Sequence, residues 1–386
     1  MMKRTLAAGL AALLLASAAT LPSQAAPVKV GMITTLSGGG AGLGIDVRDG
    51  FMLALKQAGD AGAEVEVIAE DDQQKPDVAV QIADKMIQSD QVDILTGIIF
   101  SNIALAVVPA AVKQGKFYLS ANAGPSQLAG QGCDANYFNV AYQNDNQHEA
   151  AGEYANTLGY KKTFILAPNY PAGKDSLNGF KRFYKGELAG ELYTKLGQTD
   201  FAAEIAQVKA SGADSVFFFL PGGMGISFIK QFAGSDTGLP MIGPGFSFDQ
   251  DVLGAVGEAA IGAHNTAQWS PDLDNEANKA FVAAFEAEYG RLPSVYASQG
   301  YDTAQLILSA SAAADIADHD AYHAALKAAD FPSVRGNFRF GNNQHPIQNF
   351  YAREVFRNDA GVITNRVVGT AFEDHVDAFA GECPLP

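Results

Sequence analysis

The sequence predicts an α/β protein of two Rossmann-like lobes with parallel sheets, joined by a hinge through which the chain crosses three times. Short apolar runs alternate with helical patterns, the alternation restarts after a polar link, and the last third of the chain returns to both halves. Strands and helices in this alternation form βαβ units, which build parallel sheets covered by helices. At 386 residues the chain is too long for one typical domain and fits two.

The first lobe is predicted from the alternation that begins at residue 28. Residues 28–34 are apolar and β-branched, as in a buried strand, and Val47, Phe51 and Leu55 recur with a helical period over residues 46–58. The same patterns predict strands at 65–69, 92–97 and 116–120 and helices at 76–87 and 103–112.

The second lobe is predicted from the alternation that resumes after the polar link at residues 143–147. Helices are expected at 149–158, 175–188, 201–209 and 224–232, and strands at 162–166, 191–196, 215–220 and from 241 onward. The last third predicts helices at 275–289, 296–314 and 321–328 and antiparallel strands at 334–340, 349–356 and 362–368.

The three crossings between lobes are expected near Tyr142, Trp269 and Phe331. Trp269, the only tryptophan, is expected to pack in the hinge. The first lobe would then comprise residues 26–142 and 269–331, and the second lobe residues 143–268 and 332–386.

The N-terminus has the pattern of a cleaved secretory signal peptide over residues 1–25. Lys3 and Arg4 precede an apolar run at 6–21, and Ser23-Gln24-Ala25 places small residues at the −3 and −1 positions of a cut before Ala26. The alternative is a membrane anchor, but the run is short for a span of about 20 residues. The sequence therefore predicts a secreted, periplasmic protein.

The charge of the chain excludes some classes of partner, and its cysteine content predicts a disulfide. The formal net charge of −16, with no basic tract, argues against nucleic acid and anionic membranes as partners. The two cysteines, Cys133 and Cys383, are expected to form a disulfide in an oxidising compartment, the alternative being two free thiols.

Catalytic patterns in the sequence are weak. The glycine run at 38–44 lacks the spacing of a dinucleotide fingerprint or a P-loop, and it is expected to form a flexible loop at a cleft. His319 and His323 have the spacing of a zinc-binding HExxH motif, but Asp320 replaces the glutamate and His319 is expected to precede the helix. No cofactor, metal or catalytic site is expected.

Two loops after neighbouring strands of the first lobe are candidates for binding an anion. Ser101 and Asn102 begin a predicted helix, whose free N–H groups can hold a carboxylate, although they also suit an ordinary N-cap. The Ser-Ala-Asn-Ala-Gly-Pro sequence at 120–125 follows the next strand. Because carboxyl ends of parallel strands share one edge of the sheet, the two loops can act together.

Aromatic side chains occupy the corresponding loops of the second lobe. Tyr170, Phe246 and Phe248 follow predicted strands there, where they either pack locally or stack against a ligand. As a set directed at one cleft, they favour a flat apolar ligand.

The ordered set of motifs resembles the ABC-transporter substrate-binding proteins of the branched-chain-amino-acid type, which have the type I periplasmic binding fold. The resemblance extends over residues 28–368. It implies a monomeric receptor, without enzymatic activity, that delivers a small molecule to an ABC permease in the inner membrane. The motifs that carry it are Val30-Gly31, Thr35-Leu36-Ser37-Gly38, Arg48-Asp49-Gly50-Phe51, Glu70-Asp71-Asp72, residues 120–125 and Gly300-Tyr301-Asp302.

One departure from the family pattern concerns the ligand. Amino-acid-binding members place an acidic residue after the Gly-Pro that corresponds to Gly243-Pro244, where it pairs with the ligand ammonium. Here Gly245 and Phe246 follow, and a desolvated ammonium without a carboxylate would be costly. The stretches at 97–105, 122–128, 168–175 and 217–225 are most similar to the subgroup that binds benzoates and hydroxycinnamates.

The resemblance also implies roles for individual residues. Tyr170, or alternatively Ala172, would contact the ligand from the second lobe, and Leu43 would lie over it. Gly222 and Phe246 would cover the ring. The residues implied for the carboxylate are Ser101, Asn102, Asn122, Ala123 and Gly124.

Three alternatives remain open at this point. One is a receptor for a branched-chain amino acid, amide or urea on the same fold. A second is a secreted hydrolase, which would need a nucleophile with its base or a complete metal site. The third is a ligand-sensing module that serves a signalling partner rather than a permease.

Overall fold

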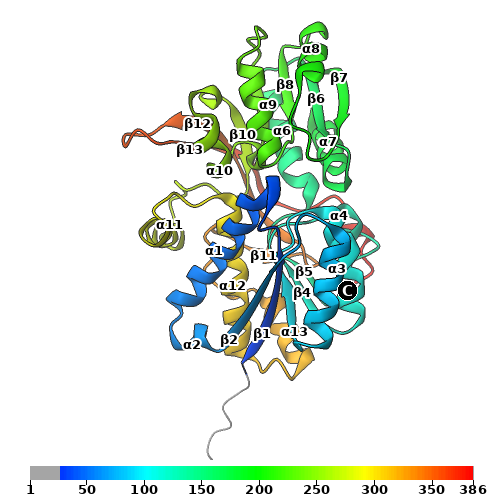
Figure 1. Cartoon of the computed structure of the whole chain (residues 1–386), viewed down its shortest axis with the longest axis vertical. Coiled ribbons are helices and arrows are strands. Elements are labelled where there is room, and N and C mark those ends of the chain that lie inside the picture. Colours follow the sequence, from blue (N-terminus) through cyan, green and yellow to red (C-terminus); the bar gives the residue numbers. More distant parts are fainter. Residues whose placement is uncertain (1–26, 386) are drawn as a thin grey trace, which may run out of the picture.

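The computed structural model describes residues 27–385, so the predicted signal peptide lies outside the described residues. Two sheets organise these residues, and Figure 1 shows them one above the other, in separate lobes. The first sheet has five parallel strands in the order β2-β1-β3-β4-β5. Its strands are β1 (Val28–Thr34), β2 (Val65–Asp71), β3 (Ile94–Thr96), β4 (Phe117–Ser120) and β5 (Tyr137–Asn139).

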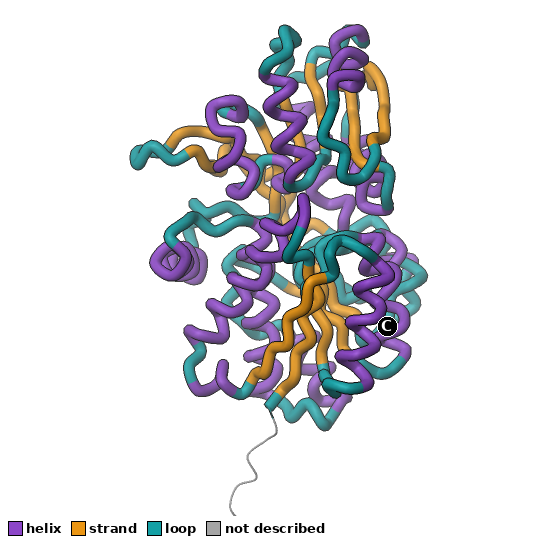
Figure 2. Tube along the Cα trace, in the orientation of Figure 1, coloured by secondary structure: helices purple, strands orange, loops and turns teal. Residues whose placement is uncertain are grey.

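Helices cover both faces of the first sheet (Figure 2). The chain supplies five of them directly and adds three more after it has passed through the second lobe. They are α1 (Ala41–Gln57), α2 (Asp60–Ala63), α3 (Pro76–Gln88), α4 (Ser101–Lys113), α5 (Ser126–Ala129), α11 (Glu276–Tyr289), α12 (Val295–Ala313) and α13 (His319–Ala328).

Helices α1 and α12 pack against each other through two glycines. A Cβ on Gly50 would lie 1.9 Å from the carbonyl oxygen of Ala297, and a Cβ on Gly300 would lie 2.0 Å from that of Val47. Only glycine permits this backbone approach. The contact fixes α12, and with it Tyr296 at the start of that helix, against the first lobe.

The second sheet has the order β11-β12-β10-β9-β8-β6-β7, with β13 paired to β12. The central strands are parallel, and β11, β12 and β13 are antiparallel additions. The strands are β6 (Lys162–Pro168), β7 (Glu187–Thr194), β8 (Ser215–Phe218), β9 (Met241–Pro244), β10 (His264–Ala267), β11 (Arg339–Phe340), β12 (Pro346–Arg357) and β13 (Ile363–His375). Its helices are α6 (Asn144–Thr157), α7 (Pro171–Phe183), α8 (Ala202–Ala210), α9 (Gly223–Ala233) and α10 (Gln250–Val256).

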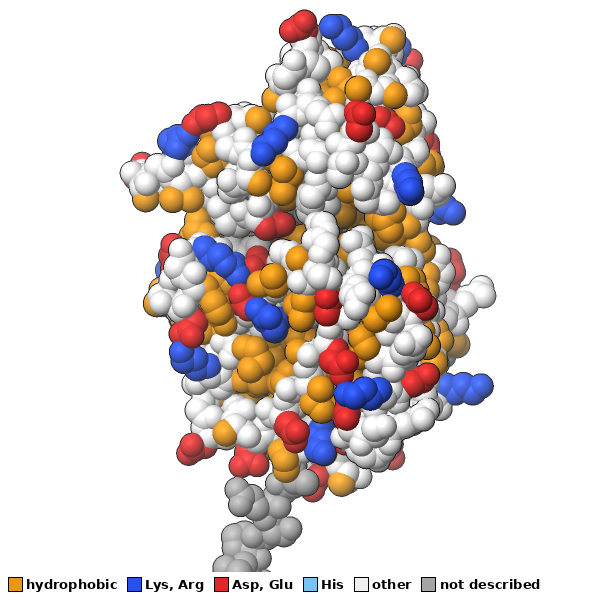
Figure 3. Space-filling model, viewed as in Figure 1, with side chains coloured by type: hydrophobic (Ala, Val, Ile, Leu, Met, Phe, Trp, Pro, Cys, Tyr) orange, Lys and Arg blue, Asp and Glu red, His pale blue; other side chains and the backbone are white. Residues whose placement is uncertain are grey.

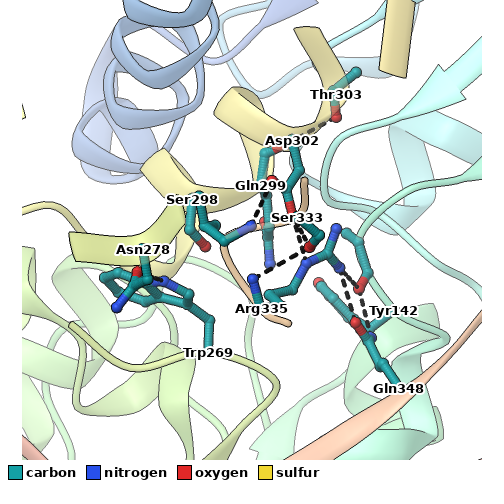
Figure 4. A network of polar contacts seen from close by, with 12 residues as sticks. Tyr142, Trp269, Asn278, Ser298, Gln299, Asp302, Thr303, Ser333, Arg335 and Gln348 are labelled. Atoms are coloured by element: carbon teal, nitrogen blue, oxygen red, sulfur yellow. Dashed lines mark hydrogen bonds and ion pairs between the residues drawn. The ribbon is translucent and has the colours of Figure 1, made fainter. Parts of the chain in front are cut away.

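The chain passes between the two sheets three times, after β5, after β10 and before β11, so the predicted fold class is confirmed. The division of the chain into lobes at 142, 268 and 331 stays a prediction. A buried network links two of these passages (Figure 4). The Arg335 guanidinium donates to Asp302 at 2.9 Å, to the Ala141 carbonyl at 2.9 Å and to Gln348 at 2.9 Å.

Trp269 lies next to the remaining passage. Its side chain is fully buried, and its indole N–H donates to Asn278 at 2.7 Å. Its carbonyl accepts from Arg353 at 2.9 Å. These contacts give the buried indole N–H and carbonyl of Trp269 hydrogen-bond partners from other segments, as buried polar groups require.

The structure corrects several predicted boundaries. Residues 143–147 are not a link, because Gln143 caps helix α6, which begins at Asn144. Residues 38–44 are not a loop, because a short 3-10 helix at Gly38–Gly40 leads directly into α1. Helix α7 begins at Pro171, four residues before the predicted start, since proline suits the first turn of a helix.

The C-terminal region also differs from the prediction in detail. His319 does not precede α13 but begins it, after the cap Asp318. The strand predicted at 334–340 is reduced to Arg339–Phe340. The predicted disulfide is confirmed: Cys133 is bonded to Cys383, with a Cα–Cα distance of 5.8 Å. Among the residues that the structure describes, no helix is long and apolar enough to cross a membrane.

Candidate functional site

A cavity lies where the carboxyl ends of strands from both sheets face each other. The space between the atoms that line it is about 350 Å³, part of which is open to solvent. Side chains from both lobes line it: Leu43, Ile99, Phe100, Ser101, Asn122, Tyr142, Asn144, His148, Tyr170, Ala172, Phe219, Pro221, Phe246 and Tyr296. None of these side chains is an acid, a lysine or an arginine.

The polar end of the cavity is built on the start of helix α4. The Ser101 hydroxyl accepts a hydrogen bond from the Asn144 amide at 3.1 Å. Within residues 27–385, the main-chain N–H groups of Ser101 and Asn102 have no hydrogen-bond partner. Free N–H groups at the positive end of a helix dipole can hold an anion without a cationic side chain.

Asn122 and Tyr142 complete the polar end. The Asn122 amide donates to the Ile99 carbonyl at 2.9 Å, and its oxygen accepts from the Tyr142 hydroxyl at 3.3 Å. The first bond holds the loop after β4 against the loop after β3, and the second holds it against the segment after β5. Burial raises the pKa of Tyr142 well above its ordinary value, so its phenol stays neutral.

Aromatic rings form the remaining walls of the cavity. Tyr170 lies 6.3 Å from Phe219 with an interplanar angle of 20°, and Phe100 lies 6.4 Å from Tyr170 on the first-lobe side. Phe246 contacts Tyr142 at 4.9 Å and Tyr296 at 5.4 Å, measured between ring centroids. Rings from both lobes therefore surround a space suited to a flat apolar group.

Of the predicted ligand-binding residues, five line the cavity together: Leu43, Ser101, Asn122, Tyr170 and Phe246. Ala172, the alternative to Tyr170, lines it as well. Asn102 lies beside the cavity and its side chain does not line it.

Ala123, Gly124 and Gly222 do not line the cavity. The main-chain N–H of Ala123 donates to Ile98 at 3.3 Å and that of Gly124 donates to Asn144 at 3.1 Å, so both are already engaged within the protein. Gly222 instead serves the contact between the lobes: a Cβ there would lie 2.9 Å from the Gly39 carbonyl oxygen.

Several lining residues were not predicted from the sequence, and of these His148 and Asn144 matter most chemically. They lie four residues apart on α6, on one face of the helix. Both were overlooked because the predicted helix began at residue 149. A search for a Gln-capped helix start would have found them.

The two histidines that have the spacing of a zinc motif contact different partners. His319 stacks on Phe117 at 4.4 Å, and His323 instead contacts the Gln344 side chain at 2.9 Å. Within residues 27–385, no group of three or more His, Cys, Asp or Glu side chains is placed to hold a metal ion.

Comparison with known proteins identifies the family. A family profile described as "Periplasmic binding protein" matches residues 27–360. The chain belongs to this family. The Leu/Ile/Val-binding protein homolog 6 of Brucella melitensis is 28% identical to this binding protein, with 95% of this chain and 97% of that protein covered.

Two crystal structures of ABC-transporter solute-binding proteins are similar over almost the whole chain. One, from R. palustris in complex with benzoate, has a TM-score of 0.87 and 33% identity, and covers 93% of this chain and 100% of that one. The other is from Rhodopseudomonas palustris BisB5 in complex with 3,4-dihydroxybenzoic acid. It has a TM-score of 0.83 and 30% identity, and covers 91% of this chain and 99% of that one. This binding protein is therefore a periplasmic solute receptor of an ABC transporter, a class that binds its ligands rather than converting them.

Proposed function

We propose that this receptor captures a small aromatic carboxylate, benzoate- or hydroxycinnamate-like, and delivers it to an ABC permease in the inner membrane. We expect it to act as a monomer after its signal peptide is removed. The observation that supports this ligand best is the composition of the cavity, which combines an uncharged anion-binding end at Ser101 with walls of aromatic rings.

The missing acid argues against an α-amino acid. No aspartate or glutamate lines the cavity, and Gly245 and Phe246 follow Gly243-Pro244, where amino-acid-binding members carry the acid that pairs with the ligand ammonium. A buried ammonium without such a partner costs several kcal/mol. A carboxylate, by contrast, finds the free N–H groups of Ser101 and Asn102 and the Ser101 hydroxyl.

The mechanism follows from the two lobes. The carboxylate docks on the first lobe at Ser101, and the second lobe then closes and places Tyr170 and Phe246 over the ring. Closure excludes water from the cavity, which strengthens the hydrogen bonds to the carboxylate. Bonds between the lobes accompany closure: the Ser126 hydroxyl donates to Asp175 at 2.8 Å, and the Ser126 N–H donates to the same carboxylate at 3.1 Å.

A receptor for a branched-chain amino acid on the same fold is the second candidate, and the name of the Brucella relative favours it. The two candidates differ in the ligand groups that they require. An amino acid would need an acid brought into the cavity from another loop, whereas an aromatic acid needs none.

The test is a ligand screen on the mature chain from Ala26 onward. We expect benzoate, 4-hydroxybenzoate or 4-hydroxycinnamate to raise the melting temperature and to bind in calorimetry, and leucine, isoleucine and valine to do neither. Stabilisation by the branched-chain amino acids alone would overturn the proposal.

A matched pair of serine variants locates the carboxylate. Ser101→Ala removes a buried hydroxyl that would bond a charged group, so we expect a loss of about 1.5–3 kcal/mol, or roughly 10- to 150-fold in affinity. The exposed Ser89→Ala, at the end of α3, should bind as the wild type does.

A further inference from the structure

His148 differs from every other polar side chain that lines the cavity. It is 2% exposed, and its Nδ1 is completely buried without a hydrogen-bond partner. None of the other lining side chains has a fully buried polar atom that is unpaired. Leaving such a group unpaired costs about 1–3 kcal/mol, so a ligand that supplies the partner gains the corresponding free energy.

The surroundings of His148 fix its charge state. Its ring contacts Phe219 at 5.1 Å and the edge of Phe217 at 5.9 Å. Burial among these rings lowers its pKa to about 3, so the imidazole is neutral at physiological pH. A neutral imidazole carries one N–H donor and one acceptor nitrogen. It therefore suits a hydroxyl group, which can both donate and accept, better than a second carboxylate.

His148 lies away from the carboxylate end of the cavity by one turn of helix. Asn144, four residues earlier on the same face of α6, contacts the Ser101 hydroxyl. One turn of helix separates the two positions by about 6 Å along the axis. A ligand that engages both Ser101 and His148 must therefore carry its two polar groups at opposite ends of the ring.

We propose that His148 determines specificity within the aromatic acids by hydrogen bonding to a hydroxyl at the far end of the ring, so that the receptor prefers hydroxylated ligands such as 4-hydroxybenzoate. This inference rests on the proposed function, since it takes the carboxylate to lie at Ser101. A site with a polar group for a ligand hydroxyl discriminates against the analogue that lacks it, because the protein group then stays unpaired.

The test compares benzoate with 4-hydroxybenzoate by calorimetry. The wild type should bind 4-hydroxybenzoate about tenfold more tightly, or better. In His148→Phe that ratio should fall to about one, with the affinity for benzoate kept within roughly threefold. His148→Asn and His148→Gln place an amide near Nδ1 and Nε2 respectively, and one of the two should restore part of the preference.

A readout on the wild type does not depend on the folding of any variant. In long-range 1H–15N spectra, the ring nitrogens of His148 should shift with 4-hydroxybenzoate and much less with benzoate. Equal affinities for the two acids, with no selective shift, would overturn the inference while leaving the proposed function intact. If neither acid binds, the proposed function itself is wrong and the inference falls with it.

Discussion

The carboxylate of Asp175 joins the two lobes, and its removal should weaken ligand binding without touching the ligand. Asp175 lies on α7 of the second lobe and is 6% exposed. It accepts two hydrogen bonds from Ser126, on α5 of the first lobe, and one at 2.9 Å from Asn144. When the lobes separate, water replaces the two bonds from Ser126, so these bonds favour the closed state only by their net strength.

The magnitude follows from those two bonds. After exchange with water, a typical intramolecular hydrogen bond contributes about 0.5–1.5 kcal/mol, so we take about 1 kcal/mol for each of the two bonds. Asp175→Ala should therefore disfavour closure by about 2 kcal/mol. Because only the closed state encloses the ligand, the apparent affinity should fall by roughly 30-fold.

Calorimetry and small-angle scattering together test this reasoning. Asp175→Ala should bind more weakly and should show a larger radius of gyration at ligand concentrations that close the wild type. Asp274→Ala is the matched control, since that exposed carboxylate forms an ion pair with Lys279, a residue close to it in the chain. A double-mutant cycle with Ser126→Ala should give a coupling of about 1 kcal/mol. Additive effects of the two substitutions would refute a direct contact between the lobes.

Three further predictions concern stability. Gly300→Ala forces a Cβ against the Val47 carbonyl, so it should lower the free energy of unfolding in denaturant by about 1–3 kcal/mol or more. An unchanged unfolding midpoint would contradict the close packing of α1 and α12. Reducing the bond between Cys133 and Cys383, which are 250 residues apart, should cost about 2–5 kcal/mol, seen as a lower melting temperature with reductant. Burial raises the pKa of Asp249 to about 7 in the folded protein. Between its ordinary pKa and pH 7, Asp249 is therefore protonated in the folded protein but ionised in the unfolded protein. Folding takes up a proton in this range, so the stability of the protein falls as the pH rises through it. Asp249→Asn should lessen this fall by about 1 kcal/mol per pH unit between pH 5 and 7, whereas identical pH profiles of melting temperature would rule out the raised pKa.

The alternation of strands and helices was sufficient to predict the fold, because each βαβ unit is a local pattern of about 30 residues. Short elements were harder to find. Strand β5 was missed because three residues are too few to show a period, and it is held by pairing with β4. The start of α6 was missed because Gln143 and Asn146 form its capping box, whereas the usual sequence signal has serine or threonine three residues before glutamate or glutamine.

The candidate site could be predicted only in part, for a related reason. Ser101, Tyr170 and Phe246 follow strands, and the carboxyl ends of parallel strands are where ligands bind. Tyr296 was missed because it reaches the cavity from the start of α12, which joins the first lobe only after the chain has passed through the second. Single-sequence patterns carry no information on such distant contacts.

The cavity is lined by no acidic side chain, lysine or arginine, whereas the surface of the protein carries many of them. The chain carries a net charge of −16, and on the face shown in Figure 3 its acidic and basic side chains are interspersed. A negatively charged protein repels an anionic ligand at long range, but this repulsion is screened beyond about 8–10 Å at physiological salt. Recognition of the proposed carboxylate would therefore depend on short-range donors, for which the free N–H groups of Ser101 and Asn102 are suited.

The polar contacts around Ser101 also connect ligand binding to closure. Asn144 donates to the Ser101 hydroxyl and to the Asp175 carboxylate, so one side chain lies between the ligand end of the cavity and the bonds from Ser126 that cross the lobes. A carboxylate that engages Ser101 would orient its hydroxyl and thereby Asn144, because hydrogen bonds in a chain polarise one another. The same ligand group that docks on the first lobe would then strengthen the contact that holds the second lobe closed, which a cavity relying on ring stacking alone could not do.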